Sequence, residues 1–494
     1  MRHDSVVIGS GPAGVACASA LVARGITPLV LDGGVRFDPN RVESVPPPSF
    51  DLNTLPLKPI FGSLFPYAPT GAGVRLTGGV GAVPSLAVGG LSTVWGAGIL
   101  PYAAEDIADW PVSAADLHPH YRAVLGFVPL AGVRDALAER FPLHVEPAAL
   151  RVTPQIESLL DDLRSNEVRL RDVGVVAGRA RLAVNMSKCD YLGLCLTGCP
   201  HGAVYSSAHT LDVLAAAGSI MHDAGAVVTR FEETRDGVRL SVRGASEPIV
   251  ARRVYVACGA LPTTRLVLAS LEQDKPVVIR DSAYFTFPVL RRRLHTPRVS
   301  PSIAGNTLAQ VFVAIDDDAV SSRLVHLSVY GFNDLMLRAL AARAHVSERV
   351  ALRVLQPLLA RLLFVQGFLH SDESPGMRAT MSGDELFVAP EPGNVTPRAR
   401  AVLAKLRSIR AELGLDPLRP LLRVWPPGKG FHAGAVFPMR EDPGPLETDI
   451  LGRLSGFERV HVVDASVLPT VPGGTITLSV MANAHRIATL ADES

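Results

Sequence analysis

The chain has 494 residues, of which 48% are apolar, and its 48 basic and 47 acidic side chains give a net charge of +1. This length suits about two or three domains around a large core and excludes global disorder. The balanced charge excludes a broad basic footprint, so we expect no nucleic-acid partner. Five cysteines exclude a scaffold held together by disulfides, although three of them cluster within residues 189–199.

No uninterrupted apolar run of 18 or more residues is present, so no transmembrane segment is predicted. The strongest candidate, residues 350–369, contains charged residues and a proline, and the pattern favours an amphipathic or partly buried helix, with a membrane-surface role left open. The chain enters the apolar segment Val6–Ile8 without a charged leader, which predicts a cytoplasmic protein.

The first 34 residues carry a dinucleotide-binding fingerprint. An apolar strand leads into Gly9-Ser-Gly11-Pro-Ala-Gly14, an alanine-rich helix follows, and a second strand ends at Asp32, 18 residues after Gly14. Gly9 permits the tight turn, Gly11 lets the backbone approach a pyrophosphate, and Gly14 lets helix and strand pack closely. The free N–H groups at the helix start then face the anion, and Asp32 suits a ribose hydroxyl. The motif alone does not separate FAD from NAD.

Further elements alternate between strand and helix signals, with a loop-dominated excursion over residues 37–80. Helices are predicted over 114–125, with Ser113 as N-cap, over 208–224 and 397–413, and from Thr477; strands are predicted at 226–228, 238–242, 254–257 and 460–463, and within 284–330 and 362–390 on either side of helical patterns at 333–362.

Four further segments carry a resemblance to a known family. They are the glycine-rich loop Ala87–Gly96, the segment Trp110–Tyr121, the strand-turn-helix segment Val254–Arg265, and a C-terminal series containing Phe431-His432-Ala-Gly434 and Val463–Thr470. In this order they resemble the motifs of the glucose-methanol-choline (GMC) oxidoreductases. The family's members are FAD enzymes that take a hydride from an alcohol carbon.

The resemblance implies an α/β fold class with an α+β second domain. A Rossmann-like FAD-binding domain, discontinuous in sequence, would comprise residues 1–284, including the cysteine segment, together with 426–494. A substrate-binding domain of β-sheet plus helices would comprise residues 285–425, the part least similar to the family's motifs.

The resemblance also implies a set of cofactor contacts. Val94 stands where some relatives attach FAD through a histidine, and a valine has no nucleophilic nitrogen, so FAD is expected to be non-covalent. The expected contacts are Gly9, Gly11, Pro12, Ala13, Gly14, Asp32, Gly33, Gly90, Ser92, Val94, Cys258, Gly259, Asp464, Ala465, Thr475 and Ile476.

His432 is the candidate catalytic base, because a neutral imidazole can accept the alcohol proton while a hydride leaves. The family normally places a second histidine or asparagine where this chain has Thr475, the second candidate catalytic residue. Three hypotheses stay open: Thr475 substitutes with reduced competence, another side chain supplies the contact, or the reaction is unusual.

Cys189, Cys195 and Cys199 form a C-x5-C-x3-C-P segment. It resembles the segment that holds a three-iron, four-sulfur cluster in bacterial FAD glucose dehydrogenases, and cysteine thiolates are the ligands of such clusters. The alternatives are a zinc site completed by His201 and a cysteine-rich structural turn.

Together these features predict a GMC-type alcohol dehydrogenase acting on a sugar, polyol or similar small-molecule alcohol. Electrons would leave through the cysteine-bound centre, or directly, to an acceptor protein or quinone. The alternatives are an alcohol oxidase that uses O2 and a non-redox lyase or binding protein that retains FAD.

Overall fold

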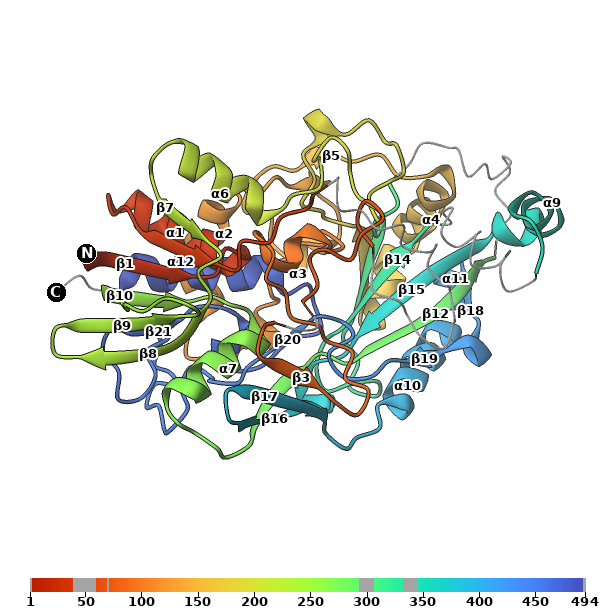
Figure 1. Cartoon of the computed structure of the whole chain (residues 1–494). Helices are drawn as coiled ribbons and strands as arrows, with labels where there is room; N and C mark the ends of the chain where they lie inside the picture. Colours follow the sequence, from red (N-terminus) through yellow and green to blue (C-terminus); the bar gives the residue numbers. More distant parts are fainter. Residues whose placement is uncertain are drawn as a thin grey trace.

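The computed structural model describes residues 2–38, 59–68, 71–292, 306–331, 341 and 345–491. Within these ranges the chain forms three main sheets and a two-stranded ladder of β4 (Ala131–Gly132) and β5 (Ala148–Ala149). Figure 1 shows the first sheet at the left, the second at the right and the third below them. Parts of the predicted excursion over 37–80 and of the helical pattern over 333–362 lie outside the described residues.

The first sheet is built on parallel strands that the fingerprint predicts. β1 (Arg2–Ile8) lies between β2 (Leu29–Asp32) and β10 (Ile249–Val256), β7 (Met221–Ala224) extends the β2 side, and β21 (Val460–Val462) pairs with the far end of β10. Val6, Val7, Val30 and Leu31 are fully buried, as in a parallel sheet covered on both faces. The hairpin of β8 (Val228–Thr234) and β9 (Gly237–Val242) pairs antiparallel with the start of β10.

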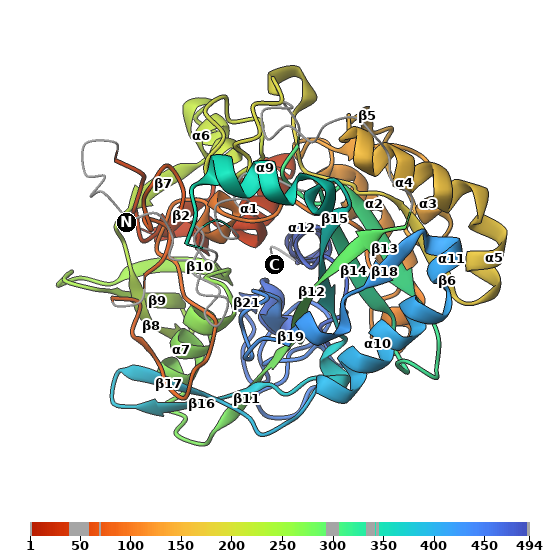
Figure 2. The same cartoon turned by 90° about the vertical axis from the view of Figure 1, so that its right-hand side faces the viewer.

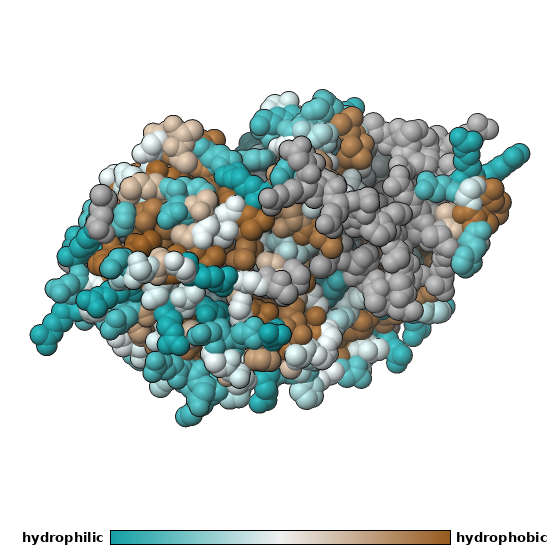
Figure 3. Space-filling view, viewed as in Figure 1, coloured by the Kyte–Doolittle hydropathy of each residue, from teal (hydrophilic) through white to brown (hydrophobic). Residues whose placement is uncertain are grey.

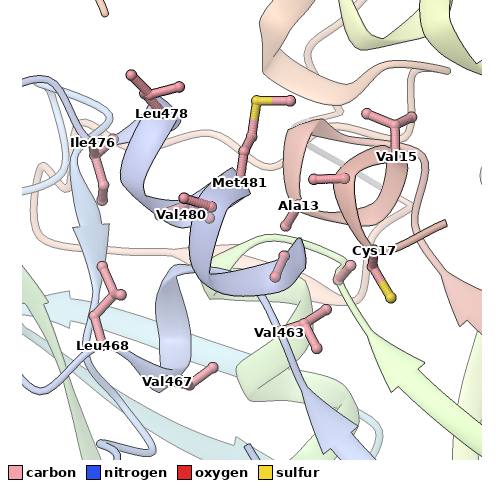
Figure 4. Close-up of a cluster of buried hydrophobic side chains, with 14 of the residues drawn as sticks. Ala13, Val15, Cys17, Val463, Val467, Leu468, Ile476, Leu478, Val480 and Met481 are labelled. Atoms are coloured by element: carbon pink, nitrogen blue, oxygen red, sulfur yellow. The ribbon is translucent and has the colours of Figure 1, made fainter. Parts of the chain in front are cut away.

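Two helices from opposite ends of the chain pack on this sheet. α1 (Pro12–Ala23) follows the glycine turn, and α12 (Thr477–Leu490) closes the chain. Figure 4 shows Met481 of α12 lying beside Ala13 at the start of α1, and both side chains are buried. This packing brings residues from the two ends of the chain into one core. The helices beside this core are α2 (Ala114–Val124), α3 (Leu137–Arg140), α6 (Ser207–Ala216) and α7 (Ala260–Ser270).

The second sheet is antiparallel. Its order is β18 (Leu415–Pro417), β12 (Tyr284–Arg291), β15 (Leu362–Phe368), β14 (Val325–Tyr330), β13 (Val311–Ile315) and β6 (Val175–Arg179), with β19 (Arg423–Val424) also on β12. β6 precedes the expected domain boundary at residue 284 yet pairs with β13. Figure 2 shows four helices on the outer side of the second sheet: α4 (Pro154–Ser165), α5 (Glu167–Asp172), α10 (Thr396–Ser408) and α11 (Arg410–Leu413).

The third sheet joins the other two. Its order is β20 (Ala433–Gly434), β11 (Val277–Asp281), β16 (Met377–Ser382), β17 (Glu385–Pro390) and β3 (Val74–Leu76). β11 runs almost directly into β12, so the segment that pairs with β20 also leads into the second sheet. This connection fixes the loop before β20 against the second sheet.

Two predicted helices are partly wrong. The helix predicted over 208–224 ends at Ala216, and Met221–Ala224 forms strand β7, because these residues complete the parallel ladder beside β2. The stretch 350–369 is also divided: α9 (Glu348–Leu359) is followed by strand β15. Val350, Val354 and Leu358 are exposed on α9, which projects at one end of the molecule in Figure 3. No described helix is long and apolar enough to cross a membrane.

Candidate active site

The turn between β1 and α1 is shaped for close backbone approach. Gly9 has φ +108°, and its N–H donates to the carbonyl of Leu31 at 2.7 Å. A Cβ on Gly14 would lie 1.9 Å from the carbonyl oxygen of Gly9, so only glycine fits there. A Cβ on Gly11 would meet no atom within 4 Å. The conformation of Gly9 and the close contact at Gly14 shape the turn, whereas the space at Gly11 is open in front of the start of α1.

Asp32 lies at the end of β2 and is 7% exposed. Its Oδ1 accepts a hydrogen bond from the N–H of Gly34 at 2.8 Å, and its Oδ2 lies 3.2 Å from Nε2 of His222. His222 was not predicted as a site residue, because β7 was expected to be helix. The carboxylate is therefore held in place at the carboxyl end of β2, beside the glycine turn.

One cavity brings together most of the predicted cofactor contacts. The predicted residues that line it are Gly9, Gly11, Pro12, Ala13, Asp32, Gly33, Gly90, Cys258, Gly259, Asp464, Ala465 and Ile476. These residues come from the two ends and the middle of the chain. The start of α12 also faces this space through Thr477 and Val480, which places helix N–H groups at its wall.

A carboxylate at the far wall organises the turn before α7. Oδ2 of Asp464 accepts hydrogen bonds from the N–H of Gly259 at 2.7 Å and from the hydroxyl of Thr263 at 2.5 Å. Gly259 has φ +87°, a conformation that side-chain-bearing residues rarely adopt. Burial raises the pKa of the neighbouring Cys258 thiol to about 12, which suits a small packing residue rather than a nucleophile.

His432 lies in the loop that leads into β20. Its ring stacks on Phe368 of β15, with centroids 4.6 Å apart and planes 26° from parallel. Nδ1 is buried without a hydrogen-bond partner, and burial lowers the pKa of the imidazole to about 4. The flanking residues Phe431 and Ala433 line the cavity described above. The lowered pKa favours a neutral His432 imidazole, which lies next to the cavity that the residues of the dinucleotide fingerprint help to line.

The cavity fits the FAD implied by the sequence. The open space at Gly11, the helix N-terminus behind it and the ordered carboxylate of Asp32 match the demands of a pyrophosphate and a ribose.

Comparisons with known proteins show which fold this chain shares. The structure is similar to pyridoxine 4-oxidase from Mesorbium loti, with TM-score 0.63, 16% identity and coverage of 98% of both chains. It is also similar to formate oxidase from Aspergillus oryzae RIB40, in a study of FAD modification, with TM-score 0.62, 14% identity and coverage of 99% of this chain and 97% of that one. The chain has the GMC oxidoreductase fold.

Among curated proteins, the 6'''-hydroxyparomomycin C oxidase of Streptomyces lividus is 24% identical over 98% of this chain and 90% of its own length. No protein-family model matches the chain. The mixed α/β class with a Rossmann-like first sheet and a β-sheet-plus-helices second unit is confirmed by the shared GMC fold.

Four predicted contacts, Gly14, Ser92, Val94 and Thr475, do not line this cavity. The hydroxyl of Ser92 donates to the carbonyl of Gly89 at 2.6 Å and lies 2.9 Å from the Ser207 hydroxyl, so it braces the glycine loop. Val94 is buried in an apolar cluster with Ile60 and Tyr67. Gly14 faces back toward Gly9.

Thr475 is 8% exposed, and its Oγ1 accepts a hydrogen bond from the N–H of Leu100 at 2.7 Å. Its methyl group would lie 3.0 Å from a Cβ placed on Gly98. The hydroxyl thus anchors a neighbouring backbone segment. Its predicted catalytic role stays a prediction.

The second sheet turns a polar and aromatic face toward His432, which sequence reasoning missed. Alternate residues of its strands belong to the outer core, as Val325, Leu327 and Val329 do on β14. The residues between them, His326, Ser328 and Tyr330, are therefore on the other face, the one that carries Phe368. The alternation His-Leu-Ser-Val-Tyr over residues 326–330 was the available signal. It could not show which face of the strand borders the site, because the neighbouring strands were not known from the sequence.

The three clustered cysteines line a small pocket together with Asp190 and His201. All three thiols are free and partly exposed. Among the described residues, no group of three or more His, Cys, Asp or Glu side chains is placed to hold a metal ion. The cysteines as placed here therefore do not fit the iron–sulfur cluster or the zinc ion considered from the sequence.

Proposed function

We propose that this chain is a GMC-family, FAD-dependent oxidoreductase that oxidises a CH–OH group of a small sugar-like or polyol alcohol. The observation that carries the proposal is the position of the His432 imidazole, which stacks on Phe368 while its two chain neighbours line the cavity formed by the FAD-type segments. A neutral base beside a hydride-accepting cofactor is the arrangement that alcohol oxidation requires.

In this proposal the cofactor domain comprises residues 1–284 and 426–494, and residues 285–425 supply most of the substrate side. The turn from Gly9 to Ala13 would hold the pyrophosphate, and Asp32 the ribose. Val94 offers no atom for a covalent bond to FAD. Gly90 and the start of α12 would bound the flavin ring.

When bound, FAD supplies the acceptor for the hydride that leaves the alcohol carbon. His432 takes the hydroxyl proton at a neutral ring nitrogen, so the substrate loses two electrons and two hydrogens and becomes a carbonyl compound. Phe368 keeps the imidazole in one orientation and excludes water from one face of the ring. The proton later returns to solvent, which restores the base.

The polar face of the second sheet supports a hydroxyl-rich substrate. Ser328 and Thr286 are 6% and 3% exposed, and Gln366 lies between them in the ladder, where its Oε1 accepts the Tyr330 hydroxyl at 3.0 Å. A row of hydroxyl and amide groups is suited to hydrogen-bond a compound with several hydroxyls.

For the electron acceptor we favour O2 over the acceptor protein or quinone of a dehydrogenase. All three compared proteins are named oxidases, and by their names one acts on 6'''-hydroxyparomomycin C and one on pyridoxine. With O2, the two electrons and two protons released from each alcohol would appear as one molecule of hydrogen peroxide.

The test is to purify the protein with its flavin and mix it anaerobically with a panel of polyols, sugars and aminoglycosides. We expect at least one compound to bleach the flavin absorbance and to yield one carbonyl product per flavin. Admitting air should then restore the absorbance and form hydrogen peroxide. A bound flavin that no alcohol reduces would contradict the proposed function, and reoxidation by a quinone but not by air would favour the dehydrogenase.

A further inference from the structure

His326 is a second buried imidazole close to His432. It lies on β14, is 1% exposed and pairs in the ladder with Phe368 of β15. Its ring centroid lies 6.4 Å from that of Phe368, the same ring on which His432 stacks. The imidazoles of His326 and His432 therefore both lie against the ring of Phe368.

One nitrogen of His326 is engaged and the other is not. Nε2 lies 3.1 Å from the hydroxyl of Ser328, whereas Nδ1 is buried without a partner. A buried polar atom left without a hydrogen bond costs about 1–3 kcal/mol, so such atoms call for an explanation. If the Ser328 hydroxyl donates to Nε2, the proton of the neutral ring resides on Nδ1, which is then a donor.

A small open space lies in the turn that packs against the ends of these strands. The turn before Thr475 docks on the same strands: a Cβ on Gly473 would lie 2.9 Å from the carbonyl oxygen of Phe368 and 3.0 Å from that of Leu324. The next residue, Gly474, is buried, yet a Cβ there would meet no atom within 4 Å. Thr475 itself is tied to the backbone of Leu100.

We propose that His326 is a catalytic residue, which donates a hydrogen bond from Nδ1 to the same alcohol oxygen whose proton His432 accepts. This inference rests on the proposed function and adds the second substrate contact. Atoms and electrons balance as before, because His326 keeps its proton throughout. Its donor stabilises the negative charge that develops on the oxygen as the proton moves to His432.

The test compares His326→Ala with His326→Asn and with the control His144→Ala. His144 is also buried, at 8% exposure, with both ring nitrogens unpartnered, but it stacks on Tyr121 of α2, away from Phe368. Flavin absorbance measures cofactor content, and anaerobic stopped-flow mixing separates alcohol binding from the limiting rate of flavin reduction.

We expect His326→Ala to retain FAD but to lose about 100-fold in the limiting reduction rate, as for removal of one donor to a developing oxyanion. His326→Asn, whose amide can still donate, should recover part of that rate, and His144→Ala should reduce at the wild-type rate. The alcohol dissociation constant, read from the perturbed flavin spectrum before reduction, should rise in His326→Ala.

Two failures are distinguishable. If an alcohol reduces the wild-type flavin and His326→Ala keeps both the rate and the dissociation constant, only the role of His326 is overturned. The same holds if His326→Asn is no faster than His326→Ala, since that points to packing. If no alcohol reduces the wild-type flavin, the proposed function fails and the substrate contact of His326 fails with it.

Discussion

The imidazole of His432 stacks on the phenyl ring of Phe368, with centroids 4.6 Å apart. This contact joins the loop before β20 to the end of β15 in the second sheet, so the base is positioned by two elements that are distant in sequence. The loop is also tied from behind, because the N–H of Gly428 donates to Oδ2 of Asp281 at 2.9 Å and the carbonyl of His432 accepts from the N–H of Ser282 at 3.0 Å. The orientation of the base therefore depends on the whole joint between sheets.

The first prediction concerns the pH dependence of flavin reduction. Burial lowers the pKa of His432 to about 4, below its ordinary 6.5, so the base is neutral and competent across the neutral range. The limiting reduction rate should stay constant from about pH 9 down to about pH 5 and should fall about tenfold per pH unit below about pH 4. Stopped-flow reduction at each pH measures this. An inflection of the rate near pH 6.5 would contradict this, because it would show that the His432 imidazole is exposed to solvent and keeps its ordinary pKa.

The second prediction separates two glycines of the fingerprint. Gly14→Ala would place a Cβ 1.9 Å from the carbonyl oxygen of Gly9, so it should lower the melting temperature of the protein without cofactor. Gly11→Ala meets no protein atom within 4 Å and should leave that temperature unchanged, yet it should weaken FAD binding, because its methyl group enters the space for the pyrophosphate.

Calorimetry of the apoprotein and FAD titration measure the two effects. If Gly11→Ala binds FAD as tightly as the wild type, the pyrophosphate does not lie against this turn.

The third prediction concerns Asp281, which supports the loop that carries His432. Burial raises the pKa of this carboxyl to about 8 from its ordinary 3.8, so between these values the folded protein holds a proton that the unfolded chain has lost. Stability must then fall as the pH rises through this window. Asp281→Asn keeps an acceptor for the N–H of Gly428, but its amide does not ionise, so its stability does not fall with pH for this reason.

The melting temperature of Asp281→Asn should match that of the wild type near pH 4 and exceed it by a growing margin up to about pH 8. Thermal unfolding of both proteins over this range measures the difference. If the melting temperatures of the two proteins differ by the same amount at every pH, the Asp281 carboxyl is not buried in the folded protein.

The fourth prediction concerns the cysteine segment. Because Cys189, Cys195 and Cys199 are not arranged as a ligand set, the variant with serine at all three positions should keep its flavin and its anaerobic rate of reduction by alcohol. Iron and sulfide analysis of anaerobically purified wild-type protein is the companion measurement. Stoichiometric iron that the variant loses would restore the cluster inferred from the spacing.

The sequence predicted the parts of the fold whose chemistry is local. The glycine turn, α1, α12 and the ordered Asp32 follow from backbone sterics and periodicity that a short segment contains. Ser113 is the predicted N-cap of α2, and it also forms a capping box with Asp116. The failures are non-local. Met221–Ala224 becomes a strand only because β2 offers an open edge, and β6 belongs to the second sheet because it pairs with β13, more than 130 residues later.

The candidate site shows the same difference between local features, which the sequence predicts, and non-local ones, which it does not. Motif residues that line the cavity could be named from spacing alone, whereas His326 could not, because its partners Phe368 and Ser328 define it only after strand pairing. Ser92 and Thr475 were predicted from their place in motifs, but their hydroxyls are engaged by neighbouring groups of the protein. Hydrogen-bond saturation depends on tertiary neighbours, and a linear pattern does not contain them.

The central claim is tested most directly by anaerobic flavin reduction in the wild type and in His432→Ala. The account predicts that a polyol or sugar-like alcohol bleaches the wild-type flavin, whereas the variant retains FAD and shows no bleaching, because it lacks the imidazole that accepts the alcohol proton. A variant that is reduced at the wild-type rate, or a wild-type flavin that no alcohol bleaches, would contradict the account.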